Sequence, residues 1–418
     1  MVPSPCALLF WTLHTAVHVC LADRSLKYVT LLYRHGDRSP VRTFPADPHQ
    51  ESAWPQGFGQ LTQEGMKQHY ELGQALRQRY QGFLSEDYSR YEISVRSTDY
   101  DRTLMSALAN LAGIYPPNGS QVFDPSLRWQ PIPVHTVPQD EERLLSFPLE
   151  CPRYKVLMDE TKQTDVFLNM TNTYKEFLEM VRNRTGLEKS TVESVWSVHD
   201  TLFCESRHNM TIPDWADADV MEKLRLLKNF GFNMMFGVYK REEKCRLQGG
   251  VLLNQILINI SQHAAPESKE RLKIMVYSAH DTTLVALQTA LDVFNGLQPP
   301  YASCHMFELH LEDDGSFSVA MFYRNDSTKD PYPLTLPGCS QYCPLQDFMH
   351  LTKPVIPEDW KKECQVENSI TDKAVILGLV LCACLLTICI LILFMLLWRH
   401  HGPSSGYQHV INEADENS

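Results

Sequence analysis

An unbroken apolar run near the C-terminus constrains this chain most. Residues 374–398, "AVILGLVLCACLLTICILILFMLLW", run for 25 positions without a charge, and a helix of about 20 such residues crosses a bilayer. The triplet "RHH" follows directly, and positive charge is typical of the cytoplasmic flank of a membrane helix. We therefore expect a single-pass chain, with residues 23–373 outside the cytosol and an acidic cytoplasmic tail over 399–418.

The N-terminus carries a second, shorter apolar segment. Residues 1–22 include "CALLFWTLHTAVHVCLA", which ends in small residues. No Lys or Arg precedes this core, so its position and composition alone indicate a secretory signal peptide cut near Ala22. Both ends of the chain thus direct the segment between them into the secretory pathway.

Cysteine usage agrees with an oxidising compartment, where thiols pair. The cysteines between the two apolar segments are Cys151, Cys204, Cys245, Cys304, Cys339, Cys343 and Cys364. Their number is odd, so complete pairing leaves one of them free. The pair in "CSQYC" could be half of a zinc site, but no second pair with zinc-ligand spacing is present. A local disulfide is the better interpretation. Six Asn-x-Ser/Thr acceptors in the same segment predict a glycosylated ectodomain: Asn118, Asn169, Asn183, Asn209, Asn259 and Asn325.

Composition and motifs argue against two classes of partner. The formal charge of -12 opposes nonspecific binding to nucleic acid, which needs a basic face. The sequence has no HExxH, no carboxylate cluster with calcium or two-metal spacing, and no Cys/His ligand set. We expect no nucleic-acid partner, no metal and no other cofactor.

Three predicted strands each end in polar chemistry. They cover residues 26–33, 91–99 and 272–281, and two of them lead into helical patterns. Strand, loop and helix in this order form the βα unit of an α/β sheet, in which ligands bind beyond the carboxyl ends of the strands. "HMFELHL" and "SFSVAMFY", joined by "EDDG", predict a later antiparallel hairpin.

The middle of the ectodomain is helical instead. A stripe of Tyr174, Phe177, Leu178 and Val181 ends at Gly186, and a stripe of Val220, Met221, Leu224 and Leu227 ends at Gly231, as helices commonly end at glycine. The sequence predicts a discontinuous α/β domain over residues 23–139 and 246–365. A helical insertion covers residues 140–245, and a juxtamembrane linker covers residues 366–373.

The stretch "RHGDRSP" places cationic groups unusually close together at the end of the first predicted strand. Arg34, His35 and Arg38 repel one another, and a bound phosphate dianion would offset that repulsion, because guanidinium groups bind phosphate oxygens bidentately. The same positive field favours a neutral His35, able to act as a nucleophile. A further arginine, Arg96, ends the second strand; a salt bridge is the alternative role for it.

This stretch resembles the signature of the histidine phosphatase superfamily, in its acid phosphatase branch. "YSAHDTT", with His280 and Asp281, resembles the second half of that family's site, and "WPQGFGQLTQEGM", "RSTDYDRTLMSA", "WQPIPVHTVP", "RLQGGVLL" and "PYASCH" resemble other parts of it. The resemblance runs from about Ser25 through the membrane span and the tail. It implies a phosphoglycerate-mutase-like α/β sheet domain with a helical insertion.

The resemblance also implies residue roles. His35 would become a phosphohistidine and Asp281 would protonate the departing alcohol. Arg34, Arg38, Arg96 and His280 would bind the phosphoryl group. Implied disulfides are Cys151–Cys364, Cys204–Cys304 and Cys339–Cys343, which leaves Cys245 unpaired. A homodimer is implied as well, with Trp129 and His135 at its interface.

The expected function is an acid phosphatase that hydrolyses phosphate monoesters in the lysosome. One alternative is an ecto-phosphatase or 5'-nucleotidase at the cell surface, and inositol phosphates or a phosphoprotein are alternative substrates, because specificity depends on the loops around the pocket. A non-enzymatic type I receptor glycoprotein is the third reading. A degenerate receptor would be expected to have lost some of the signature, yet all of it is present.

The cytoplasmic tail carries one tyrosine-based motif. Tyr407 and Val410 in "GYQHV" match the tyrosine-x-x-apolar peptides that clathrin adaptors bind, although an inert tail is the alternative for so short a motif. Lysosomal members of the resembled family end similarly. We expect internalisation from the cell surface, delivery to lysosomes, and cleavage near residues 365–373 to release a soluble enzyme.

Overall fold

The computed structural model describes residues 24–146, 151–266, 268–366 and 371–400. The chain divides into two compact units, residues 1–365 and 366–418. The expected signal peptide lies outside the described residues, as do Tyr407 and Val410 of the tail.

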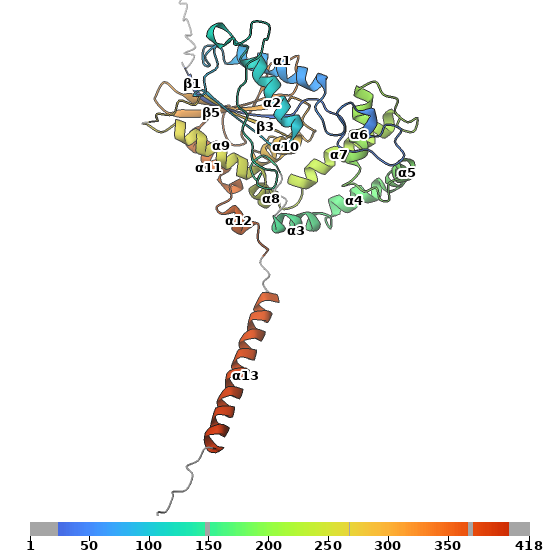
Figure 1. Ribbon diagram of the computed structural model, residues 1–418, viewed down its shortest axis with the longest axis vertical. Coiled ribbons are helices and arrows are strands. Elements are labelled where there is room, and N and C mark those ends of the chain that lie inside the picture. Colours follow the sequence, from blue (N-terminus) through green and yellow to red (C-terminus); the bar gives the residue numbers. More distant parts are fainter. Residues whose placement is uncertain (1–23, 147–150, 267, 367–370, 401–418) are drawn as a thin grey trace, which may run out of the picture. The chain divides into compact units, whose positions relative to one another are not determined.

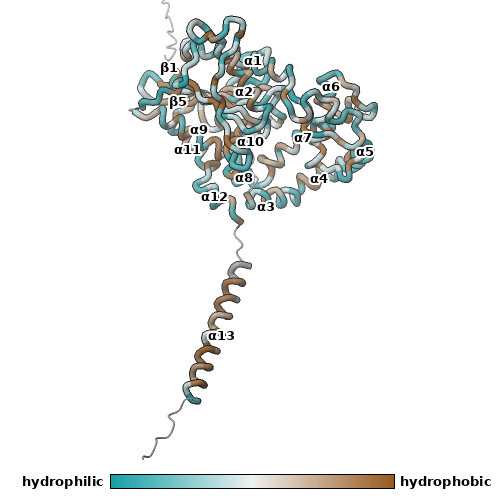
Figure 2. The backbone as a smooth tube through the Cα atoms, in the orientation of Figure 1, coloured by the Kyte–Doolittle hydropathy of each residue, from teal (hydrophilic) through white to brown (hydrophobic). Residues whose placement is uncertain are grey.

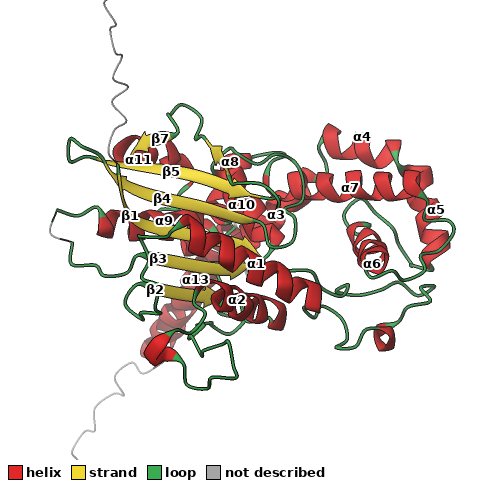
Figure 3. Cartoon of the chain, turned by 90° about the horizontal axis from the view of Figure 1, so that it is seen from above, coloured by secondary structure: helices red, strands yellow, loops and turns green. Residues whose placement is uncertain are grey.

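A mixed β-sheet forms the centre of the first unit (Figure 3). Its order is β2-β3-β1-β4-β5-β6, and β7 also pairs with β5. The first three strands run parallel, whereas β4 lies antiparallel to β1 and forms a hairpin with β5. The strands are β1 (Ser25–Arg34), β2 (Ile93–Ser97), β3 (Ile274–Ala279), β4 (Cys304–Leu311), β5 (Phe317–Arg324), β6 (Tyr332–Leu334) and β7 (Tyr342–Pro344). The structure confirms the predicted α/β fold, the three predicted strands and the predicted hairpin, and it shows that the three strands run parallel.

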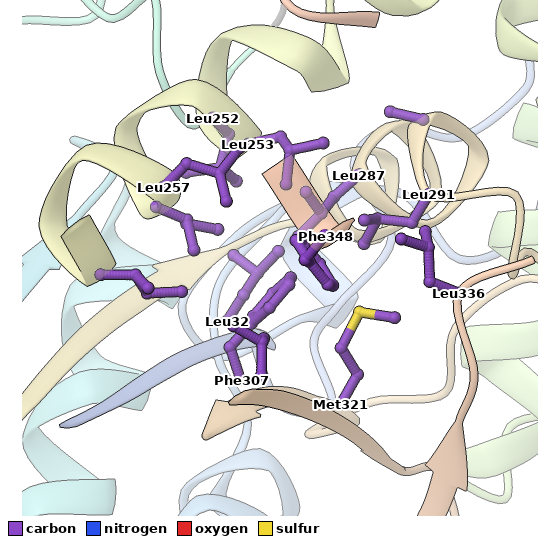
Figure 4. Close-up of a cluster of buried hydrophobic side chains, with 14 of the residues drawn as sticks. Leu32, Leu252, Leu253, Leu257, Leu287, Leu291, Phe307, Met321, Leu336 and Phe348 are labelled. Atoms are coloured by element: carbon purple, nitrogen blue, oxygen red, sulfur yellow. The ribbon is translucent and has the colours of Figure 1, made fainter. Parts of the chain in front are cut away.

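Both faces of this sheet are covered by helices, because β1 is apolar on both of its faces. Tyr28 and Leu32 pack among residues of α9 (Gly249–His263), α10 (Asp281–Ala290) and α11 (Leu345–Thr352), as Figure 4 shows for Leu32. Val29, Leu31 and Tyr33 pack on the opposite face, against α1 (Gln63–Arg79) and α2 (Asp101–Ile114). Each buried side chain of this size stabilises the fold by about 1.5–3 kcal/mol.

A group of helices follows α2 in the chain and gathers beside the sheet (Figure 1). It contains its own apolar cluster, which includes Leu178, Leu202 and Leu224. Gly186, with φ 73°, ends one of these helices in the left-handed conformation that glycine adopts readily. The helices are α3 (Pro152–Thr161), α4 (Asp165–Thr173), α5 (Lys175–Thr185), α6 (Trp196–Arg207), α7 (Ala218–Phe236) and α8 (Arg241–Leu247).

The predicted end of a helix at Gly231 is wrong, because α7 continues to Phe236. A glycine inside a helix costs roughly 1 kcal/mol relative to alanine. The residues beyond it offset that cost, since Phe232 and Phe236 are buried against Val285 and Ala286. Packing on α10 therefore outweighs the local preference for a stop.

Two of the three expected disulfides are present. Cys151–Cys364 joins the start of α3 to the end of α12 (Trp360–Glu363), and Cys339–Cys343 closes a local turn. The expected Cys204–Cys304 bond is wrong: both cysteines are free and buried, as is Cys245.

The two unbonded thiols have separate surroundings. The Cys204 sulfur lies 3.8 Å from Arg38 Nη1 and 3.8 Å from the Tyr301 hydroxyl. Cys304 instead packs in the apolar layer between the sheet and α1–α2, and its sulfur lies 3.8 Å from the His305 carbonyl oxygen.

The second unit contains one long helix, α13 (Thr371–His400). Its segment Val375–His400 is long enough and apolar enough to cross a membrane, and the apolar part of this segment is not buried. Figure 2 shows this continuous apolar character along α13. The helix is therefore a candidate for a single transmembrane span.

Short 3-10 helices complete the described structure. They are Glu51–Ala53, Gly119–Gln121 and Lys353–Val355.

Candidate active site

The RHG stretch begins where β1 ends, at the carboxyl edge of the parallel strands. The backbone N–H of Arg34 donates to the Ser303 carbonyl and that of His35 donates to the Ala279 carbonyl. Gly36 then passes so close to α1 that an added Cβ would lie 2.3 Å from the Gly65 carbonyl oxygen. Only glycine fits there, so the tight approach to α1 holds His35 at the end of the sheet.

The ring of His35 has a defined orientation and tautomer. Its Nδ1 lies 2.8 Å from the Gly36 carbonyl oxygen, and a carbonyl can only accept, so Nδ1 carries the proton. The other nitrogen, Nε2, therefore keeps its lone pair. Burial, followed by the charges of Arg34, Arg102 and Arg38, holds the pKa of His35 well below its usual range. This lowered pKa favours the neutral imidazole, which can act as a nucleophile.

Three buried or largely buried arginines supply positive charge around His35. Arg34 Nη1 donates to the Pro299 carbonyl at 2.7 Å, and its guanidinium carbon lies 4.2 Å from the centre of the Tyr301 ring. The Nε atoms of Arg34, Arg38 and Arg102 are buried and have no hydrogen-bond partner. These N–H groups are donors that can bind the oxygens of an anion.

The ring of His280 lies beside that of His35, with the ring centres 5.7 Å apart. Its Nδ1 is 3.5 Å from Arg102 Nη2, and its Nε2 is 3.0 Å from Thr98 Oγ1. Because a guanidinium only donates, Nδ1 accepts and Nε2 donates to the threonine. Burial and the charge of Arg102 lower the pKa of His280 to about 3, so this ring is neutral too.

Asp281 is the first residue of α10, where the helix dipole favours negative charge. Its Oδ1 accepts from the Thr282 N–H at 2.8 Å, and its Oδ2 accepts from Gln298 Nε2 at 2.7 Å and Arg34 Nη2 at 3.0 Å. Burial alone would raise the pKa of Asp281, but Arg34 and Gln298 lower it to about 2. Without an anion at the site, Asp281 is a carboxylate.

Helix α6 braces the loop that carries the signature. Arg38 forms a bidentate ion pair with Asp200, at 2.9 and 3.0 Å. Asp37 accepts from Arg207 Nε at 2.9 Å and contacts His208 Nε2 at 2.7 Å. The catalytic loop and α6 are therefore joined by charged hydrogen bonds with little or no exposure of the acidic partner.

Arg96, near the end of β2, has an ionic partner, and its expected phosphate-binding role stays a prediction. Its Nη2 lies 3.0 Å from Oε1 and 3.1 Å from Oε2 of Glu142, which is buried. The ion pair that was its alternative role is thus present. Arg102, in the first turn of α2, contacts His280, and its charge acts on His35.

Sequence reasoning missed Arg102 although it lies in the quoted stretch "RSTDYDRTLMSA". The available signal was its place in the first helical turn after a strand, at the ligand-binding edge of the sheet. Asp200, Gln298 and Lys228 had no comparable local signal. Among the described residues, no group of three or more His, Cys, Asp or Glu side chains could hold a metal ion.

Comparisons with known proteins identify the family of this chain. The sequence model of the histidine phosphatase superfamily (branch 2) matches residues 25–324. The chain belongs to this superfamily. It is 58% identical to human lysosomal acid phosphatase over 393 residues (94% of this chain, 92% of the relative) and 57% identical to the Xenopus laevis protein of that name over 411 residues (98% and 94%).

More distant similarity extends to other members. Human prostatic acid phosphatase is 52% identical over 364 residues, 87% of this chain and 92% of the relative. Among solved structures, Hafnia alvei phytase in complex with tartrate has a TM-score of 0.63 at 19% identity, covering 82% of this chain and 99% of that one. At this identity, the likeness to the phytase shows the fold alone.

Proposed function

We propose that the chain is an acid phosphatase that hydrolyses phosphate monoesters through a phosphohistidine on His35. One observation carries the proposal. The hydrogen bond from His35 Nδ1 to the Gly36 carbonyl leaves the lone pair on Nε2, at a site that also holds three arginines and a carboxyl group. A nucleophile, charge stabilisation and a proton source are the requirements for cleaving such an ester.

In the first step, His35 Nε2 attacks phosphorus while the bond from phosphorus to the ester oxygen breaks. The N–H donors of Arg34, Arg38 and Arg102 stabilise the phosphoryl oxygens. Asp281 donates its proton to the departing oxygen, which leaves as an alcohol. The products are phosphohistidine and an ionised Asp281.

Asp281 is ionised in the free site, so its protonation has to accompany substrate binding. A phosphate that engages Arg34 weakens the ion pair between Arg34 and Asp281. The negative charge of the phosphate also raises the pKa of the carboxyl group. An acidic compartment then supplies the proton that the leaving group needs.

In the second step, water attacks the phosphorus of the phosphohistidine and the bond from phosphorus to His35 breaks. The carboxylate of Asp281 accepts the proton of that water, so the acid of the first step is regenerated for the next cycle. Inorganic phosphate leaves the three arginines, and His35 is again neutral.

Trapping experiments test this mechanism. Brief exposure to phosphate-labelled substrate, followed by denaturation, should leave acid-labile label on a peptide containing His35. His35→Ala should abolish both turnover and label. Label on a serine or aspartate, or residual turnover by His35→Ala, would contradict the proposal. Assaying an aryl phosphate, a nucleoside monophosphate and an inositol polyphosphate in parallel would identify the preferred substrate.

We further propose a lysosomal location reached through the cell surface. The candidate membrane span, and the similarity to relatives named lysosomal acid phosphatases, support a membrane-anchored lysosomal protein. Tyr407 and Val410 would bind a clathrin adaptor. Tyr407→Ala should then increase the amount of protein at the cell surface and slow its uptake, whereas unchanged uptake would leave only the membrane anchor.

We also propose that the protein assembles as a homodimer. Trp129 is 37% exposed and His135 is exposed on a segment that pairs with the edge strand β2. Both side chains are therefore accessible to a second copy. Sedimentation of the ectodomain should report a dimer, and Trp129→Ala combined with His135→Ala should shift it toward monomer.

The expected N-glycans are also proposed rather than tested. Asn118, Asn169, Asn183 and Asn209 are exposed, which suits modification. Asn259 differs, because it is half-buried in α9 and its amide side chain contacts Gln255 and the Tyr277 hydroxyl; Asn325 is also half-buried. Peptide mapping after enzymatic deglycosylation should therefore find the first four sites occupied more fully than Asn259.

A further inference from the structure

A short chain of polar contacts reaches Asp281 from outside the signature. Lys228, on α7, lies with its Nζ 2.6 Å from Gln298 Oε1. The other end of the same amide, Gln298 Nε2, lies 2.7 Å from Asp281 Oδ2. One side chain therefore joins a cation from the helical group to the carboxyl group that serves as proton donor.

The ammonium of Lys228 and the carboxylate of Asp281 together determine which way the Gln298 amide points. An ammonium has donors and no acceptor, so Lys228 must face the oxygen of the Gln298 amide. The nitrogen of that amide then necessarily faces Asp281. A reversed amide would place its NH2 group against the ammonium and its oxygen against a carboxylate, so both contacts would be repulsive.

Lys228 retains its proton under the conditions that matter. Burial and the charge of Arg34 lower its pKa to about 8, so it is an ammonium at acidic pH. Its second contact is His199 Nδ1, at 3.1 Å. Burial and Lys228 lower the pKa of His199 to about 3, and the neutral ring can accept a hydrogen bond. Both acceptors hold the ammonium in place.

We propose that Lys228 is a positioning residue, which fixes the Gln298 amide with its nitrogen toward Asp281 and so controls the proton donor of the reaction. This inference rests on the proposed function. A donor aimed at Asp281 favours the carboxylate, whereas an acceptor aimed at it would favour the carboxylic acid. The orientation of one amide thus decides how readily Asp281 gives up its proton to the leaving oxygen.

Other charged and titratable groups act on Asp281 as well, and any test must hold them constant. They are Arg34 and Arg38 from β1 and the loop after it, Arg102 from α2, and His280 at the start of α10. Three further titratable groups contact members of this set or Lys228: His35 lies beside His280, Asp200 pairs with Arg38, and His199 contacts Lys228. Substitutions at Lys228 and Gln298 leave all of these side chains in place.

The test is the pH dependence of kcat, which reports groups in the enzyme–substrate complex. With an alkyl phosphate such as glycerol phosphate, Lys228→Met should move the alkaline limb upward by about one pH unit, because Asp281 loses a fixed donor. Lys228→Arg, which also only donates, should restore the limb of the native enzyme. The shift should be smaller with 4-nitrophenyl phosphate, whose leaving group needs less protonation.

A double-mutant cycle separates positioning from the bare charge of Lys228. Gln298→Leu should shift the limb as Lys228→Met does, and the double variant should show no further shift. Additive shifts would mean that Lys228 acts through its charge and would overturn the inference, as would an unmoved limb in Lys228→Met.

Two controls keep the result interpretable. Inhibition by inorganic phosphate, measured in each variant, establishes that a folded site is being compared. If Lys228→Met does not fold, Lys228→Ala takes its place, and added propylamine should return its pH profile toward native. Turnover by His35→Ala would refute the proposed function, whereas an inactive His35→Ala with an unmoved limb at position 228 would refute this inference alone.

Discussion

Both terminal nitrogens of Arg38 donate hydrogen bonds to the carboxylate of Asp200, at 2.9 and 3.0 Å. The two side chains are 7% and 9% exposed. A guanidinium in this environment needs an anionic partner to offset its desolvation. Asp200 therefore holds Arg38 in place and leaves its Nε free of other partners.

Asp200→Asn should destabilise the fold and weaken turnover together. Removing one partner of a buried ion pair costs about 3–5 kcal/mol in unfolding free energy. Because a bound anion can replace the lost carboxylate, inorganic phosphate should raise the melting temperature of Asp200→Asn more than that of the native protein. Urea unfolding and thermal melts with and without phosphate measure both effects. The exposed pair of Asp219 and Lys223 gives the control, since Asp219→Asn should change stability by less than about 1 kcal/mol.

Changing Arg102 to alanine should mainly lower kcat/KM, whereas changing Arg96 to alanine should mainly lower the free energy of unfolding. Arg102→Ala removes a charged donor from the site, which is worth about 1.5–3 kcal/mol, so kcat/KM should fall roughly 10- to 150-fold. Arg96→Ala leaves Glu142 buried without its cation, so it should lower the unfolding free energy and leave KM nearly unchanged. Steady-state kinetics and urea unfolding of both variants distinguish the roles. A large rise in KM for Arg96→Ala alone would instead support the phosphate-binding role of Arg96.

Asp281→Asn should affect substrates according to their leaving groups. Loss of a general acid typically costs about 100- to 10,000-fold, and the cost should be largest for alkyl phosphates and least for 4-nitrophenyl phosphate. Single-turnover measurements of phosphohistidine formation would isolate the protonation step. Equal losses across a series of leaving groups would show that Asp281 binds or orients the substrate rather than protonating it.

Because of Glu205, we expect the free energy of unfolding to be higher at acidic pH. Both carboxyl oxygens of Glu205 are buried, and burial together with the Asp47 carboxyl group raises its pKa to about 9. In the unfolded chain the group titrates near about 4.3. Its contribution is therefore complete below about pH 4 and declines as the pH rises toward 9.

Glu205→Gln, which is uncharged at every pH, should consequently flatten the dependence of melting temperature on pH. Thermal melts at pH 5.0 and 7.5 check this, with the exposed Glu222→Gln as the matched control. A pH dependence as steep in Glu205→Gln as in the native protein would assign the effect to other groups.

Several elements followed from the sequence because their signals are local. The apolar run became α13, and the β-forming residues before Arg34 became a strand covered on both faces. The dipeptide of His280 and Asp281 lies at the junction of β3 and α10, as expected for a ligand-binding edge. Each of these features depends on residues within one or two turns of the chain, where periodicity and turn chemistry are informative.

Contacts between distant segments were decided only by tertiary structure. Asp200 is 162 positions from Arg38, and Gln298 meets both Asp281 and Lys228, the latter 70 positions away. The different partners of Arg102 and Arg96 depended on the direction of each side chain, and the free state of Cys204 and Cys304 on where α6 and β4 place them. The sequence by itself determined which chemical groups this protein brings to the edge of its sheet. Packing determined which of them meet, because an ion pair or a hydrogen bond depends on distances of a few ångströms that no local pattern encodes.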